Sequence, residues 1–160
     1  MPSLVTIGVY GWTWDAFLGA LRDADVRLLL DVRQRRGVRG AEYAWANAGQ
    51  LTAALDAAGI AYEHRQELAP TTELRQLQYR EDERLGAGRR SRGALAPEYV
   101  HRYATEILDP ADLAPVVALL PDDGAAALLC VERDPEACHR SLVAERLAAE
   151  AGVPLAHLRP

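Results

Sequence analysis

The chain has 160 residues, of which 49% are hydrophobic and 26% are charged, and its formal net charge is −5. This length and composition predict one compact domain whose core needs no disulfide staples. The acidic balance argues against a uniformly basic nucleic-acid-binding protein, although a local basic patch is compatible with it.

Lysine is absent from the sequence, because all 18 basic residues are arginine. No lysine is therefore present to form a Schiff base with pyridoxal phosphate or a carbonyl substrate. Phosphate-loop NTPases and ordinary protein kinases are excluded for the same reason. Codon bias in a GC-rich genome is the simplest explanation of the arginine content, and the exclusions hold whatever its cause.

The cysteine count and the apolar runs indicate the compartment. Cys130 and Cys138 are too few for a disulfide scaffold. The first twelve residues lack the basic and apolar regions of a signal peptide. The longest apolar runs fall far short of the roughly 20 residues that cross a bilayer. We therefore expect a cytoplasmic protein that does not associate with membranes.

Short apolar runs alternate with helical patterns along the chain. Strands are predicted at residues 4–9, 26–32, 60–64, 125–131 and 153–158. Helices are predicted after Thr13, over 48–58, 73–84, 97–108 and 111–119, and from Asp134-Pro135 to about 151. This alternation predicts a three-layer, Rossmann-like α/β sandwich with a mostly parallel sheet of about five strands. We expect a single domain over 1–160, with a helical insertion at about 65–122.

Candidate site residues follow four of the predicted strands, at the edge where open parallel sheets bind ligands. They are Tyr10 and Trp12, Asp31 and Arg33, His64 and Glu67, and Cys130 and Glu132, with Cys138, His139 and Arg140 at the next helix start. Titratable and stacking side chains from four strands converge on one edge in this arrangement. The convergence predicts a functional site there.

Each of these groups also has a structural explanation. Asp31 and Arg33 share a face and could form a surface ion pair or cap the strand. His64 and Glu67 could be a solvated pair, and the two aromatic residues could cover the core. These alternatives stay open at the level of sequence.

The segment CVERDPEACHR, residues 130–140, carries the densest chemistry. A helix N-terminus offers free N–H groups and partial positive charge, and Arg140 could add a bidentate fork. The segment therefore predicts an anion pocket. The structural alternative is a pair of buried cysteines beside a capped surface turn.

Three more specific sites fit this segment less well. A thiol phosphatase needs Arg six residues after its Cys, but Glu136 stands there after Cys130, and Arg140 is too close to Cys138. No serine lies in a G-x-S-x-G elbow, so a serine hydrolase is set aside.

A zinc site is the third possibility. Its ligands would be Cys130, Cys138 and His139, with Glu132 or His64 as a fourth. Cysteine ligands usually lie closer in sequence, and neighbouring residues of a helix point about 100° apart. These two points make zinc the less favoured interpretation, and no metal or other cofactor is predicted.

Arginines gather in two predicted loops of this acidic protein. They are Arg33, Arg35, Arg36 and Arg39 after the second strand, and Arg84, Arg89, Arg90 and Arg92 around a glycine-rich segment. Such loops favour an anionic partner, either a small molecule or a nucleic acid. The structural alternative is a solvated surface in an arginine-rich chain.

The chain resembles the domain-of-unknown-function 488 family. The resemblance rests on TIG near the start, LLLDVR, AYEHRQEL, the block LLCVERDPEACHRSLVAERL and a final LAHL, over about 5–68 and 97–158. The matching positions are Asp31, Arg33, Tyr62, Leu68, Cys130, Glu132, Cys138, His139 and Arg140. The resemblance implies an α/β fold with a polar pocket, without a settled reaction.

Two positions depart from the family pattern. Members often carry GHS after the first strand, where this chain has Gly8-Val9-Tyr10 and no histidine. Proline and serine commonly follow the DVR sequence, where this chain has Gln34-Arg35-Arg36-Gly37. Both departures lie at the predicted site.

The leading interpretation is a hydrolase that acts on a phosphate-bearing substrate, such as a nucleotide or a nucleic-acid component. Asp31 or Glu132 would be the general base or a carbocation stabiliser and His139 the acid/base partner, while Arg33 and Arg140 hold phosphate. Tyr10 and Trp12 would stack on a base. A non-catalytic nucleotide or nucleic-acid binder is the first alternative, and a thiol or zinc protein is the second.

Overall fold

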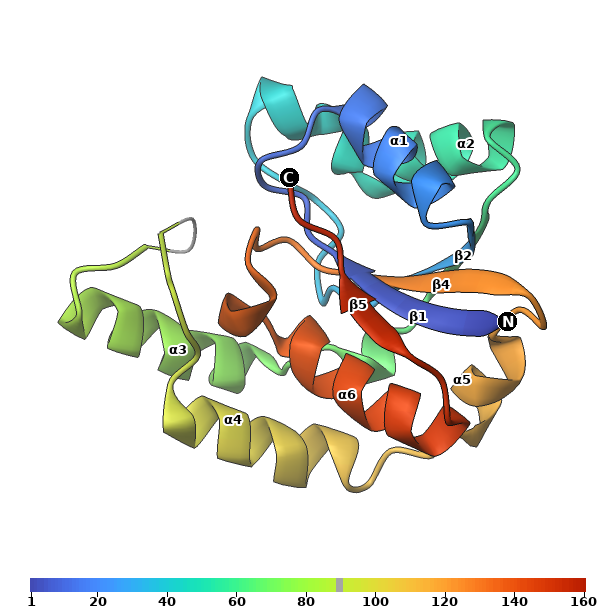
Figure 1. The fold of residues 1–160 in the computed structure, drawn as a ribbon. Helices are drawn as coiled ribbons and strands as arrows, with labels where there is room; N and C mark the ends of the chain where they lie inside the picture. The colour runs from blue at the N-terminus through green and yellow to red at the C-terminus, as the bar shows by residue number, and fades with distance from the viewer. Residues whose placement is uncertain (89–90) are drawn as a thin grey trace.

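The computed structural model describes residues 1–88 and 91–160, and they form a sheet of five parallel strands flanked by helices (Figure 1). The strands are β1 (Pro2–Ile7), β2 (Val26–Asp31), β3 (Ala61–His64), β4 (Gly124–Leu129) and β5 (Leu155–His157). Their order across the sheet is β3-β2-β4-β1-β5. The predicted Rossmann-like α/β sandwich is therefore confirmed.

Helices cover both faces of the sheet (Figure 1). The helices α1 (Trp14–Asp23) and α2 (Ala48–Ala57) lie on one side. On the other side lie α3 (Thr72–Arg84), α4 (Pro97–Tyr103), α5 (Ala114–Leu119) and α6 (His139–Ala151). Short 3₁₀ turns occupy Ala41–Ala46, Gln66–Leu68 and Pro135–Ala137, and a π-helical turn, Ala104–Leu108, continues α4.

Local sequence signals explain most of these boundaries. The Thr13 hydroxyl accepts a hydrogen bond from the Ala16 N–H at 3.2 Å and so caps α1 as predicted. Gly59 adopts a φ of 76° just after α2, a conformation that glycine reaches without strain. Strand β4 is buried along its whole length, as expected of a central parallel strand with both faces covered.

The predicted helix start at Asp134-Pro135 is wrong. The proline begins only the 3₁₀ turn Pro135–Ala137, and the Asp134 side chain makes no capping hydrogen bond there. Cys138 then returns to an extended conformation, with φ −139° and ψ 143°, and α6 begins at His139. Pro135 therefore begins a single 3₁₀ turn instead of the long helix, and Cys138 lies outside α6.

The carboxyl ends of four strands are level. Leu129 of β4 pairs with Ile7 of β1 and with Asp31 of β2, and Asp31 pairs with His64 of β3. The chain leaves β2 for β3 through α2 on one face, whereas it leaves β4 for β5 through α6 on the other (Figure 1). This divergence opens a crevice beyond β2 and β4, where doubly wound sheets bind ligands. No described helix combines the length and apolarity needed to traverse a bilayer.

Candidate functional site

A pocket of about 670 Å³ lies beyond the carboxyl ends of β2 and β4. The loops that follow these two strands form its floor, through Arg33 and Gln34 on one side and Cys130 and Glu132 on the other. Helix α3 and the segment before α4 form its outer wall. The volume falls in the range of small-molecule sites, roughly 300–1,000 Å³.

Asp31 lies beneath this floor in a buried ion pair with Arg33. The two Asp31 oxygens accept hydrogen bonds from Arg33 Nε at 2.9 Å and Nη2 at 2.8 Å. The Tyr62 hydroxyl donates to the same carboxylate at 2.6 Å, and Arg33 also donates to the Ala46 carbonyl. Since Asp31 is fully buried and its oxygens are occupied by these donors, it fixes the position of Arg33.

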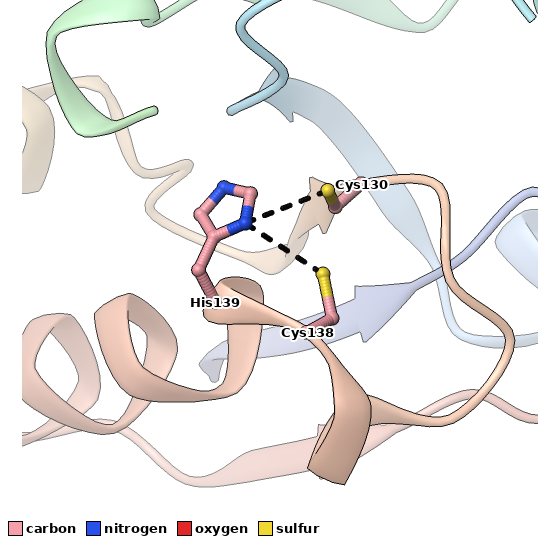
Figure 2. Close-up of side chains that lie close together, drawn as sticks. All are labelled: Cys130, Cys138 and His139. Atoms are coloured by element: carbon pink, nitrogen blue, oxygen red, sulfur yellow. Dashed lines mark hydrogen bonds between the residues drawn. The ribbon is translucent and has the colours of Figure 1, made fainter. Parts of the chain in front are cut away.

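Three side chains meet at the base of the pocket, as Figure 2 shows. His139 Nδ1 lies 3.6 Å from Cys130 Sγ and 3.8 Å from Cys138 Sγ. On the far side of the ring, His139 Nε2 lies 2.8 Å from the carbonyl oxygen of Val32 and donates its proton there. The ring is thereby held with Nδ1 toward both sulfur atoms.

The two thiols differ in their ionisation. Burial raises the pKa of Cys130 well above its ordinary value, and its Sγ lies 3.5 Å from Glu132 Oε2. Burial also opposes ionisation of Cys138, but the hydrogen bond from Cys130 and the charge of His139 outweigh it and hold the pKa of Cys138 well below its ordinary value. Burial would lower the pKa of His139, yet the Cys138 thiolate raises it. The opposite directions of these two shifts favour transfer of a proton from Cys138 toward His139.

Glu132 is linked to the outer wall through Arg92. The Arg92 guanidinium binds Asp82 of α3 at 2.7 Å and lies 3.6 Å from Glu132, while it also donates to the Ala137 carbonyl. Both ion pairs are largely buried. Arg92 thus fastens the segment before α4 to the floor of the pocket.

Arg140 fixes the loop after β4 from below. Its Nη1 donates to the Glu132 carbonyl and its Nη2 donates to the Arg133 carbonyl at 3.1 Å. A Cβ atom on Gly8 would lie 1.9 Å from the same Glu132 oxygen, so this position requires glycine. Gly8 and Arg140 both lie close to the Glu132 backbone carbonyl, and together they fix the position of the Glu132 backbone.

The mouth of the pocket is rich in positive charge. Five of its described lining residues are arginines, namely Arg33, Arg35, Arg39, Arg75 and Arg92. Glu132 is the one acidic residue among the described lining. Arg33 and Arg92 are bound to Asp31 and Asp82, whereas Arg35 and Arg75 have no carboxylate partner among the described residues. Arg75 donates to Gln34 at 2.6 Å and to the Tyr79 hydroxyl at 3.0 Å, both neutral groups.

The residues that the sequence singled out divide into two groups. Those that line the pocket are Tyr10, Arg33, Cys130, Glu132, Cys138 and His139. Asp31, His64 and Arg140 lie behind this lining, where His64 Nε2 contacts the Arg33 carbonyl at 2.8 Å. Trp12 packs edge-on against Phe17, 6.4 Å between ring centres, and the exposed Glu67 contacts Arg65.

Sequence reasoning missed the contributions of α3 and α4. These are Arg75, Gln78, Tyr79 and Tyr99. Their positions on amphipathic helices are indistinguishable from core or surface positions, and no spacing links them to the strand ends. Of the arginines expected in the second basic loop, Arg92 is buried in the ion pair above and Arg84 binds Glu81 on the surface, while Arg89 and Arg90 lie outside the described residues.

The base of the pocket has the donor set of a metal site. The ligand atoms of Cys130, Cys138 and His139 all lie within 4.8 Å of one another. The expected 100° separation of Cys138 and His139 does not occur, because Cys138 is extended and precedes α6. That argument against a metal is therefore wrong.

Comparison with known proteins identifies the family. A model of "Domain of unknown function DUF488" matches residues 13–147, which include both loops that form the floor of the pocket. No curated protein and no solved structure matches the chain significantly. The match assigns no role to the individual residues of the segment 130–140. It covers most of the chain, and the protein therefore belongs to the DUF488 family.

Proposed function

We propose that the protein is a hydrolase that acts on a small phosphate-bearing substrate, such as a nucleotide or a nucleic-acid component. The observation that carries the proposal is that one pocket combines basic side chains at its mouth with titratable side chains at its base. Arg35 and Arg75 lie at the mouth, and the buried Cys130, Glu132, Cys138 and His139 lie at the base.

Arg35 and Arg75 are the groups best suited to hold the phosphate. Guanidinium groups bind phosphate oxygens bidentately, and neither arginine is paired with a described carboxylate. Tyr10, Tyr79 and Tyr99 line the same pocket, and their rings offer faces on which a base can stack. Trp12 lies outside the pocket, so Tyr10 takes the stacking role that both were expected to share.

Glu132 is the group best placed to accept a proton during hydrolysis. It is the acidic residue among the described lining, and it lies beside the cysteine–histidine cluster. Asp31, the other expected base, is buried beneath Arg33 and acts as a positioning residue. Arg140 likewise positions the Glu132 backbone instead of binding phosphate.

A non-catalytic nucleic-acid binder is the alternative, and two contacts weigh against it. Arg92 and Arg84, two of the arginines expected in the second basic loop, are bound to Asp82 and Glu81. Arg33, Arg35 and Arg39 of the first basic loop line a concave pocket of small-molecule size.

The test is turnover of a panel of nucleotides and sugar phosphates by wild type and Glu132→Gln, with ligand binding measured on both. Loss of general base catalysis predicts turnover about 10²–10⁴-fold lower with binding retained. Glu63→Gln, on an exposed position of β3, is the matched control. Binding of nucleic acid alone, abolished by salt and without turnover of any compound, would favour the alternative.

A further inference from the structure

We propose that Cys130, Cys138 and His139 bind one zinc ion whose open coordination position faces the pocket. Cys₂His is an established set of protein ligands for catalytic zinc, which keeps its fourth position for water or substrate. All three side chains line the pocket, so an ion between them is accessible to a ligand bound there. The ion deepens the proposed hydrolase function, but its binding can be measured without any substrate.

The separations of the histidine nitrogen from the two sulfur atoms match a tetrahedral ion. With Zn–S and Zn–N bonds of about 2.3 and about 2.1 Å, a tetrahedral site places nitrogen about 3.6 Å from each sulfur. The observed separations from His139 Nδ1 are 3.6 Å and 3.8 Å (Figure 2). The histidine nitrogen therefore already lies at a suitable distance from both sulfur atoms, and all three ligand atoms lie within 4.8 Å of one another.

The surroundings orient the histidine as a metal ligand. His139 Nε2 is fixed on the Val32 carbonyl, so the nitrogen that faces the sulfurs is Nδ1. Metal-bound histidines almost always use their second nitrogen in this way. Tyr103 packs edge-on against the ring, with 5.5 Å between ring centres, and limits its rotation.

Charge balance also favours a divalent cation at this position. The site is buried, and a buried charge is costly unless it is compensated. Two thiolates cancel the charge of Zn²⁺, and the soft sulfur ligands favour zinc over Mg²⁺ or Ca²⁺. Because cysteine binds zinc as the thiolate, zinc binding to the two thiols releases protons to solvent.

The bound ion defines the hydrolytic step. Glu132 accepts a proton from zinc-bound water, and the resulting hydroxide oxygen attacks the electrophilic centre of the substrate. The bond to the leaving group breaks, the leaving group takes the electron pair, and the proton on Glu132 returns to it. One water is consumed, and nothing is oxidised or reduced.

The test is zinc content and Co²⁺ substitution of wild type and three variants, all purified with a non-thiol reductant. Wild type should retain about one Zn²⁺ per chain after dialysis, and Co²⁺ should give thiolate charge-transfer and intense tetrahedral visible bands. His139→Ala should lose both signals. His139→Cys should restore them, because a third thiolate replaces the nitrogen, and His101→Ala, on an exposed position of α4, should match wild type.

Three results decide the proposal. Failure of the wild-type protein to bind Zn²⁺ and Co²⁺ overturns it, and this result does not depend on whether any variant folds. Equal metal content in His139→Ala also overturns it, because the ion then lies elsewhere. Full turnover by metal-free protein would contradict the zinc proposal and support the hydrolase proposal. Stoichiometric zinc without turnover of any phosphate compound would support the zinc proposal and contradict the hydrolase proposal.

Discussion

His139 Nε2 lies 2.8 Å from the carbonyl oxygen of Val32, and the two residues are 107 positions apart. This hydrogen bond joins the start of α6 to the end of β2 across the switch point of the sheet. It provides a donor for the carbonyl oxygen of Val32, the first residue after β2. It also orients the ring so that Nδ1 faces the two thiols. One contact therefore serves both the fold and the candidate site.

Removal of this contact should cost stability as well as function. His139→Ala leaves the buried Val32 carbonyl without its donor, and an unsatisfied group of this kind costs about 1–3 kcal/mol. The free energy of unfolding from urea titration should fall by at least that amount. His101→Ala, at an exposed position, should stay within about 0.5 kcal/mol of wild type. Equal losses in the two variants would contradict this role.

Asp31 and Asp25 allow a matched comparison of two ion pairs. Each aspartate binds an arginine two residues later, but Asp31–Arg33 is buried and Asp25–Arg27 is exposed. Asp31→Asn should cost about 3–5 kcal/mol of unfolding free energy, because it leaves the Arg33 charge buried and unpaired. Asp25→Asn should cost less than about 1 kcal/mol. Chemical denaturation of both variants measures the difference, and similar costs would show that Asp31 does not neutralise Arg33.

Gly8 should tolerate no side chain. An added Cβ would lie 1.9 Å from the Glu132 carbonyl oxygen, so Gly8→Ala must displace the loop after β4 or prevent folding. Overpacking of this kind costs about 1–3 kcal/mol or more. Gly19→Ala, in open space on α1, should instead gain about 0.5–1 kcal/mol. Thermal melting of the two variants compares them directly; a stable Gly8→Ala protein would contradict the close approach.

Tyr62 predicts a loss of stability at high pH. Burial raises the pKa of Tyr62 to about 12, and its hydrogen bond to Asp31 acts in the same direction. Since the unfolded pKa is near 10.0, the neutral hydroxyl contributes fully below that pH, and its contribution declines as pH rises from 10 toward 12. The difference in unfolding free energy between wild type and Tyr62→Phe should shrink across this window. A constant difference through pH 12 would refute the shift.

The fold was largely predictable from the sequence, because buried runs such as LLLDV and AAALLCV have the character of central parallel strands. The strand-end position of Cys130 and Glu132 was predictable for the same reason, since parallel strands end at a common edge. The extended conformation of Cys138 was not predictable, because Asp134-Pro135 is a strong helix-start signal that a 3₁₀ turn also satisfies.

The outer wall of the pocket depends on tertiary packing. Arg75 and Tyr79 reach the pocket because α3 lies across the carboxyl edge of the sheet, and their own helix carries no signal of this placement. Sequence left the Asp31–Arg33 pair open between a surface or capping role and a catalytic one. Its burial beside Tyr62 and Ala46 became visible only once the loop after β2 was placed.

The most direct test of the central claim is calorimetric titration of a nucleoside monophosphate and its parent nucleoside into wild type, Arg75→Gln and Arg84→Gln. If the pocket binds phosphate through its arginines, the monophosphate should bind more tightly than the nucleoside. Arg75→Gln should then weaken monophosphate binding about 10–100-fold, the effect of one charged hydrogen-bonding group. Arg84, which lies on α3 outside the pocket, should have no effect. Equal binding of the two ligands, or equal loss in both variants, would contradict a phosphate-binding pocket at this edge of the sheet.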